Sequence, residues 1–191
     1  MSYKYKDKLC IKSPIDIAIY LRLIYDLKPR TIIEIGSKEG GSALLFKDII
    51  TLYDLECHIW SIDINPLTEL IIPGVTFIEG DINNMEKSLT ERHWASFKEP
   101  VLIVEDSEHT YDACLSCLNY FGKRMGKGDM IIIEDGILNE LGLKSRYNGG
   151  PNRAIKKYLK TNRDVFEIVT EYCDMFGSNV TYNPNGYLRK L

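Results

Sequence analysis

Two short runs of apolar residues constrain the fold of this chain most strongly. Val101–Val104 (VLIV) and Met130–Ile133 (MIII) contain no alternating polar residue. Runs of this kind are typical of strands in a parallel sheet that is covered on both faces. Thr31–Ile35, His58–Ile62 and Val75–Ile78 are three further β-rich runs, and longer patterns at helical spacing separate the five. Strands that alternate with helices in this way predict a doubly wound α/β sheet.

The remaining sequence predicts the helices around this sheet and two final strands. Helices are expected at Ile15–Leu27, from about Ser42, and at Asn83–Phe97, Thr110–Met125 and Asn152–Leu159, with strands at Val165–Thr170 and Val180–Leu188. No repeat or linker divides the chain, so we expect one domain over residues 1–191 with a helical segment over 1–29. The stretch 136–152 is rich in glycine and asparagine, and we expect it to be a substrate loop.

Composition and charge exclude several classes of function. The formal net charge of -3 lacks the basic surplus expected of a nucleic-acid-binding protein. No apolar run approaches the ~20 residues needed to cross a membrane, and no signal peptide is recognisable. The cysteines number five, which argues against a disulfide framework and for reduced thiols. We therefore expect a cytoplasmic protein without nucleic-acid or membrane partners.

Polar residues, most of them acids, follow the expected strands. Glu34–Ser42 (EIGSKEGGS) forms a glycine-rich turn, and Asp63 can accept two hydrogen bonds from a ribose diol. Gly80–Ile82, Glu105–His109 and Glu134–Asp135 follow three other strands. Each feature alone is often only a tight turn or a helix cap. Together they favour a ligand site, because ligands of open α/β sheets bind beyond the carboxyl ends of the strands.

The glycine-rich turn also separates two cofactor classes. A dinucleotide fingerprint reads G-x-G-x-x-G, but here Lys38 occupies the second glycine position. Glu34 would repel a pyrophosphate, whereas the cationic sulfonium and ammonium groups of S-adenosylmethionine tolerate it. The turn therefore favours S-adenosylmethionine over a nicotinamide dinucleotide.

Three acids are expected to converge at the ends of two neighbouring strands. Asp106, Glu134 and Asp135 would repel one another unless a cation lies among them. Oxygen ligands favour magnesium, with calcium or manganese as alternatives. Such an ion lowers the pKa of a bound hydroxyl, and His109, three residues after Asp106, is a candidate general base. Asp106 and His109 are therefore the candidate catalytic residues. The alternative for His109 is a residue at a helix N-terminus that bonds only the backbone.

Seven segments resemble a known family. They are EIGSKEGGSALLF, SIDINP, FIEGDI, DSEHTYD, GDMIIIEDGI, GGPNRAIKKYL and TYNPNGYLRK, and they span nearly the whole chain. In these motifs the chain resembles the cephalosporin hydroxylase/rhamnosyl O-methyltransferase family, which is related to catechol-type O-methyltransferases. The resemblance implies a Rossmann-like class I methyltransferase fold with an antiparallel last strand. It also implies methylation of a hydroxyl group on a sugar of a polysaccharide or glycoside, or on a natural product.

The resemblance further implies roles for particular residues. S-adenosylmethionine would be bound by Glu34, Gly36, Ser37, Gly40, Ser42, Asp63, Asp81 and Ile82, with Asp63 on the ribose and the last two near the adenine. A divalent metal would be bound by Asp106, Glu134 and Asp135. His109 departs from the catechol-type pattern, which has a lysine there, and Lys38 replaces a central glycine.

Three functions stay open at this point. The first is a metal-assisted O-methyltransferase that acts on a small-molecule or glycan acceptor. The second is an oxidoreductase that uses a nicotinamide or a nucleotide-sugar on the same topology, and the third is a non-catalytic binding module. A homo-oligomer is a further open expectation.

Overall fold

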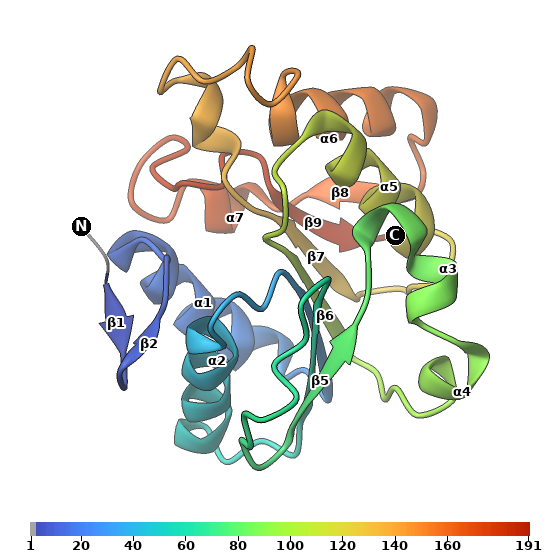
Figure 1. Cartoon of the computed structure of the whole chain (residues 1–191). Coiled ribbons are helices and arrows are strands. Elements are labelled where there is room, and N and C mark those ends of the chain that lie inside the picture. Colours follow the sequence, from blue (N-terminus) through green and yellow to red (C-terminus); the bar gives the residue numbers. More distant parts are fainter. Residues whose placement is uncertain (1–2) are drawn as a thin grey trace.

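A seven-stranded sheet forms the centre of the computed structural model, which describes residues 3–191 (Figure 1). Its strands are β3 (Thr31–Ile35), β4 (His58–Asp63), β5 (Val75–Glu79), β6 (Val101–Glu105), β7 (Met130–Ile133), β8 (Phe166–Ile168) and β9 (Tyr187–Lys190). Their order is β5-β4-β3-β6-β7-β9-β8, and β9 runs antiparallel to both of its neighbours. The expected doubly wound, mostly parallel sheet with an antiparallel last strand is confirmed. Residues 1 and 2, which the domain prediction includes, lie outside the described residues.

Helices cover both faces of this sheet. They are α1 (Pro14–Leu27), α2 (Gly41–Leu52), α3 (Met85–Ser88), α4 (Glu91–Trp94), α5 (Tyr111–Phe121), α6 (Gly150–Thr161) and α7 (Thr170–Cys173), with 3-10 turns η1 (Ile82–Asn84) and η2 (Gly136–Asn139). Figure 1 shows α1 and α2 on one side of the sheet and α5 and α6 on the other. Within residues 3–191, every helix is too short or too polar to cross a bilayer.

The apolar strands have no alternation because both of their faces are buried. In β6, Leu102 packs into a core cluster with α1 and α2, whereas Ile103 packs into a second cluster with α5 and α6. In β7, Ile132 belongs to the cluster with α1 and α2, and Ile131 belongs to the cluster with α5 and α6. Successive side chains of a strand point to opposite faces, so a sheet between two helical layers requires apolar residues at every position.

Three expected elements differ from the structure. The single helix expected at Asn83–Phe97 is wrong, because Leu89 is extended and buried and Thr90 begins α4 with a capping box. The expected helical segment over 1–29 is helical only in α1. A short hairpin of β1 (Lys4–Tyr5) and β2 (Lys8–Leu9) precedes it and lies beside α2, where the Leu9 N–H donates to Glu39. Within 180–188, only the last two residues belong to strand β9.

A buried carboxylate joins α1 to the C-terminal segment. Asp16 is 2% exposed. It accepts hydrogen bonds from the Thr181 hydroxyl, from the Tyr182 N–H at 3.1 Å and from the Tyr187 hydroxyl at 3.2 Å. Hydrogen bonds to a buried charged group are among the stronger ones in proteins. Asp16 therefore holds the start of α1 against the turn that precedes β9.

We expect Asp16→Ala to lower the free energy of unfolding by about 3 kcal/mol, because three donors, two of them buried, lose their acceptor. Urea denaturation measures this change. Asp26→Ala on the same helix is the matched control. Asp26 pairs with Arg22 at the surface, where ion pairs contribute little. Equal losses for the two variants would contradict a structural role for the buried contacts of Asp16.

Candidate active site

A cavity of about 480 Å³ lies at the carboxyl ends of the parallel strands. Strand order reverses between β3 and β6, and this switch point is where ligands bind in open α/β sheets. The volume falls within the range of small-molecule pockets, roughly 300–1,000 Å³. Its lining includes nine of the residues selected from the sequence: Gly36, Ser37, Ser42, Asp63, Asp81, Ile82, Asp106, His109 and Asp135.

The turn after β3 shapes one wall of this cavity. Gly36 has a φ of +102°, and a Cβ there would lie 2.3 Å from the backbone oxygen of Asp106. Only glycine therefore allows the ends of β3 and β6 to approach this closely. The Lys38 N–H donates to the Asp63 carboxylate at 3.0 Å, which fixes Asp63 beside the turn.

Two of the expected cofactor residues lie behind the wall rather than on it. Gly40 caps α2 and packs beneath Leu67 and Leu70. Glu34 is fully buried in β3, where the hydroxyl of Ser61 donates to Oε2 at 2.5 Å. Its Oε1 has no hydrogen-bond partner among residues 3–191, and burial raises the pKa of this carboxyl. A carboxyl oxygen without a partner in the described part of the chain is thus buried close to the cavity.

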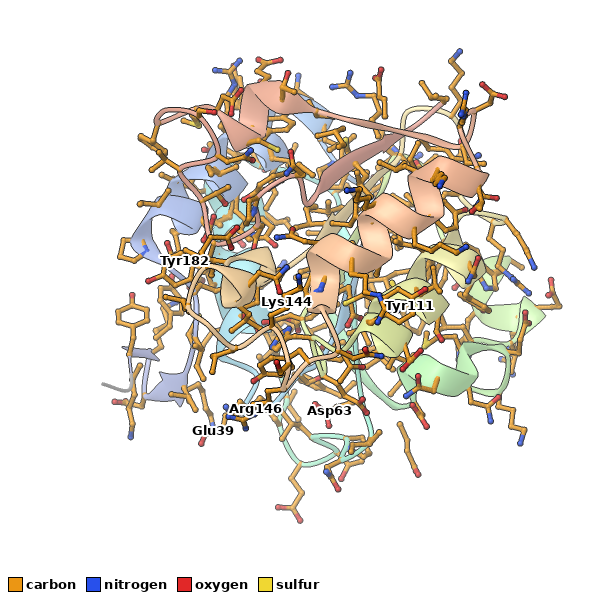
Figure 2. All side chains as sticks on the ribbon, turned by 90° about the horizontal axis from the view of Figure 1, so that it is seen from above. Glu39, Asp63, Tyr111, Lys144, Arg146 and Tyr182 are labelled. Carbon is orange, nitrogen blue, oxygen red and sulfur yellow. The ribbon has the colours of Figure 1, made fainter. Side chains whose placement is uncertain are left out.

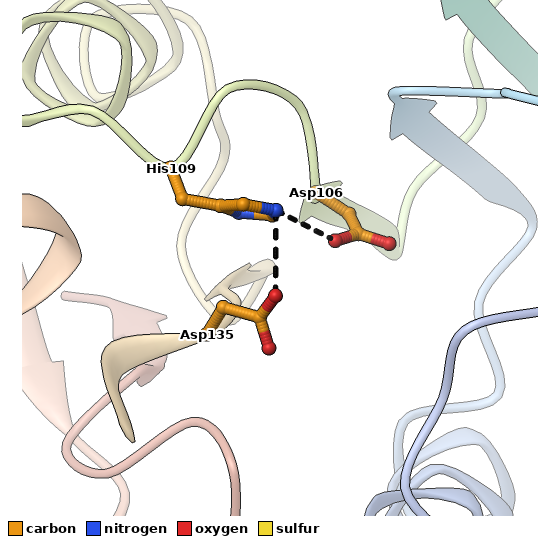
Figure 3. A group of neighbouring side chains, drawn as sticks. All are labelled: Asp106, His109 and Asp135. Carbon is orange, nitrogen blue, oxygen red and sulfur yellow. Dashed lines mark ion pairs between the residues drawn. The ribbon is translucent and has the colours of Figure 1, made fainter. Parts of the chain in front are cut away.

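Asp106, His109 and Asp135 meet in the lining of the same cavity (Figure 3). His109 Nε2 lies 3.3 Å from Asp135 Oδ2 and 3.8 Å from Asp106 Oδ1. One ligand atom from each residue lies within 4.8 Å of the other two. His109 has a left-handed backbone with a φ of +55°, in the turn between β6 and α5. The structure therefore brings both candidate catalytic residues and one further expected metal ligand together.

Glu134 lies beside this group but makes different contacts. Its carboxylate is 2.8 Å from the ammonium of Lys12 and accepts a hydrogen bond from the Tyr20 hydroxyl. The same ammonium lies 2.5 Å from Asp106 Oδ2. Asp135, the next residue, has a left-handed backbone with a φ of +57°. The side chains of these two adjacent acids therefore point in different directions.

Lys12 is fully buried and charged. Burial alone would lower its pKa, but the carboxylates of Asp106, Glu134 and Glu34 raise it above its usual range. The residue lies between the hairpin and α1, and its two ion-pair partners are 94 and 122 residues away in sequence. Sequence reasoning missed Lys12, because a lysine in a lysine-rich N-terminal segment gives no periodic or motif signal.

Asn183 is a second residue that sequence reasoning did not select. It is 1% exposed, and its Oδ1 accepts the Asp135 N–H at 2.9 Å. The Tyr187 hydroxyl accepts from its side-chain amide at 3.2 Å. Both residues belong to the segment TYNPNGYLRK, which is one of the seven family motifs. That membership was the signal that could have identified Asn183. The segment fixes the backbone of Asp135 and hence one wall of the cavity.

A second, larger cleft of about 890 Å³ adjoins the cavity. It runs between the N-terminal segment and η2, and Leu9, Ile11 and Asp135 line both spaces. Most of its lining is apolar, including Ile137, Leu138, Leu141 and Tyr182. Seen from above (Figure 2), Tyr182 and Tyr111 lie on opposite sides of Lys144, which belongs to the stretch 136–152.

The residues present fit both expected ligands. The cavity has the size for a nucleoside ligand, and the buried charge of Glu34 suits a cationic one. The carboxylates of Asp106 and Asp135 offer oxygen ligands that suit a hard divalent cation, and the His109 imidazole lies within 4.8 Å of both.

Comparisons with known proteins show the family to which the chain belongs. The sequence model of the rhamnosyl O-methyltransferase/CmcI family matches residues 1–191. A rhamnosyl O-methyltransferase of Mycobacterium leprae (strain TN) is 27% identical over 187 residues, covering 94% of this chain and 79% of the relative. The resemblance deduced from the seven segments is confirmed.

Solved structures of CmcI share the fold. CmcI with SAH is 25% identical, with a TM-score of 0.74, covering 99% of this chain and 82% of CmcI. CmcI with Mg and SAM is 24% identical, with a TM-score of 0.71 over 99% of this chain and 76% of that one.

The close approach of Gly36 to Asp106 leads to a testable expectation. Gly36→Ala combines an unfavourable positive φ with a clash against the Asp106 backbone. Gly128→Ala has a similar φ of +92° but meets nothing within 4 Å, so it isolates the cost of the backbone conformation. We expect about 1 kcal/mol of destabilisation for Gly128→Ala and ~1–3 kcal/mol more for Gly36→Ala. Chemical denaturation compares the two, and equal values would mean that the turn relaxes freely.

Proposed function

Because the chain belongs to the rhamnosyl O-methyltransferase/CmcI family, we propose that it transfers a methyl group from S-adenosylmethionine to a hydroxyl group of a sugar or natural product, assisted by a divalent metal ion. One observation carries the proposal. Two carboxylates and a histidine, those of Asp106, Asp135 and His109, line a nucleoside-sized cavity at the switch point of the sheet. A methyl donor and an activated hydroxyl must meet at such a place.

The donor occupies the 480 Å³ cavity. The Asp63 carboxylate accepts hydrogen bonds from the ribose hydroxyls. Asp81 and Ile82 lie beside the adenine. Gly36, Ser37 and Ser42 line the end nearest the amino-acid part of the donor. Glu34 and Gly40 act from behind the wall, Glu34 through its charge and Gly40 by starting α2.

The acid cluster and His109 prepare the acceptor hydroxyl. Asp106 and Asp135 would hold the metal ion, with Glu134 as the third expected ligand. When bound, the ion supplies positive charge that lowers the pKa of the hydroxyl. His109 Nε2 would take the hydroxyl proton, and the Asp135 carboxylate, 3.3 Å from Nε2, would stabilise the positive charge that the imidazole then carries. The acceptor oxygen then forms a bond to the methyl carbon as the carbon–sulfur bond breaks, which yields S-adenosylhomocysteine and a methyl ether.

The acceptor lies in the adjoining 890 Å³ cleft, where Asp135 belongs to both spaces. A sugar hydroxyl reaches the acid cluster, and the rest of the acceptor lies along Ile137, Leu138, Leu141 and Tyr182. Since most of this lining is apolar, we propose that the acceptor sugar carries an apolar substituent. The stretch 136–152 thus remains the expected substrate loop.

We also propose that the enzyme works in the cytoplasm. The five cysteines are free, and four of them are buried. Free thiols are typical of a reducing compartment, which supports the cytoplasm as the location. Assembly into a homo-oligomer stays a prediction.

Asp106→Asn tests the separation of donor binding from catalysis. We expect methyl transfer to fall by at least roughly 1,000-fold, because the cluster loses a charge that binds the cation and faces His109. The dissociation constant for S-adenosylhomocysteine should change less than about threefold, since the amide remains compatible with the cavity wall. Calorimetric titration and a radiolabelled methyl-transfer assay give the two values. Asp112→Asn on the exposed side of α5 is the control with the same charge change.

Two outcomes would contradict this assignment. Absence of binding of both S-adenosylmethionine and S-adenosylhomocysteine to the folded protein would reject the methyltransferase function itself. Loss of donor binding in Asp106→Asn with unchanged magnesium affinity would instead reject the role of Asp106.

The acceptor cleft is tested with alkyl rhamnosides of different chain length. An octyl rhamnoside should have a KM at least about tenfold below that of methyl rhamnoside, because its chain buries apolar surface in the cleft. Leu141→Ser should remove most of this difference and leave the binding of S-adenosylhomocysteine unchanged. Leu52→Ser, an exposed leucine on α2 outside the cleft, is the control. Chain-length dependence that survives in Leu141→Ser would place the acceptor elsewhere.

A further inference from the structure

The ammonium of Lys12 occupies the space between two of the acids assigned to the metal. Its side chain is 1% exposed, and Nζ lies 2.5 Å from Asp106 Oδ2 and 2.8 Å from the Glu134 carboxylate. Lysine is almost never fully buried unless it is paired. Here it pairs with two carboxylates that come from the ends of adjacent strands, β6 and β7.

These contacts use the oxygens that a divalent ion would need. Glu134 accepts from Lys12 and from the Tyr20 hydroxyl, so both of its oxygens already have a partner. Asp106 directs Oδ2 to Lys12 and Oδ1 toward His109. In this arrangement a divalent ion finds only Asp106 Oδ1 and the Asp135 carboxylate available, beside His109. Full coordination by all three acids requires the ammonium to leave.

The structure also offers a place for the displaced side chain. Lys12 lines the 890 Å³ cleft, which opens beside Glu134 and Asp135. A lysine has a flexible stem of four carbons, so its charged end can move several ångströms without movement of the backbone. The same side chain can therefore reach either the acids or the cleft.

We propose that Lys12 is an internal competitor of the divalent cation: its ammonium bridges Asp106 and Glu134 in the metal-free enzyme and moves into the acceptor cleft when the metal binds. This inference rests on the proposed metal-assisted function. It makes Lys12 a positioning residue with two states. In one state it keeps the acids together without a metal, and in the other it adds a positive charge to the acceptor cleft.

Lys12→Met tests the competition, because methionine keeps an unbranched side chain but carries no charge. Magnesium affinity is measured by calorimetry, and the melting temperature is measured with and without magnesium. We expect magnesium to bind at least about tenfold more tightly to Lys12→Met than to the wild type. The variant should melt on the order of 10 °C lower without magnesium, because the buried Glu134 and the partly buried Asp106 lose their cation. It should melt close to wild type at saturating magnesium. Lys8→Met, on strand β2, is the control with the same charge change.

Other outcomes would overturn the proposal. Unchanged or weaker magnesium affinity in Lys12→Met, with an equal loss of stability in the presence and absence of magnesium, would make Lys12 a purely structural residue. Binding to neither protein would reject the proposed metal site as well. Binding to Lys12→Met alone supports strong competition.

A measurement on the wild type needs no stable variant. The side-chain ammonium groups of lysine can be followed by proton–nitrogen NMR, and a buried, hydrogen-bonded group exchanges slowly enough to give a signal. Addition of magnesium should remove this signal as Lys12 enters the open cleft. A signal that persists unchanged in the magnesium-saturated protein would contradict the displacement.

Discussion

The contact between Lys12 and the acids at the ends of β6 and β7 is the interaction on which the site depends. Parallel strands that end together bring Asp106, Glu134 and Asp135 to one edge of the sheet. Negative charges gathered at one edge repel one another and oppose the close packing of the strands unless a cation lies among them. Lys12 provides that cation from the N-terminal segment. The enclosure of the acids is thus coupled to the docking of a segment remote from them in sequence.

Much of the fold could be predicted from local pattern, because the pattern reflects burial. The uninterrupted apolar runs of β6 and β7 indicated helices on both faces, and the two core clusters on opposite faces show why. The break near Leu89 could not be predicted, since the helical spacing of its neighbours continues through it. Leu89 is extended because its side chain is buried there and because Thr90 caps a new helix.

The candidate site could be predicted in its residues but not in its contacts. Asp106 and His109 are three residues apart, so their proximity follows from sequence, and Asp135 joins them because strand ends meet. The direction of the Glu134 side chain depends on partners from α1 and the segment before it, Tyr20 and Lys12. No spacing in the sequence relates residues more than a hundred positions apart, so these contacts required the three-dimensional structure.

The position of β9 has a consequence for the order in which the protein is built. The last strand lies between β7 and β8 rather than at an edge, and β8 pairs with β9 alone. On the ribosome, β8 therefore emerges without a neighbour to pair with, and the sheet stays divided until β9 has been synthesised. Asn183, which holds Asp135, emerges in the same late stretch. A nascent chain thus acquires the Asn183 contact to Asp135 only after β8 has emerged, so that termination before residue 183 yields a polypeptide whose acid cluster lacks this support.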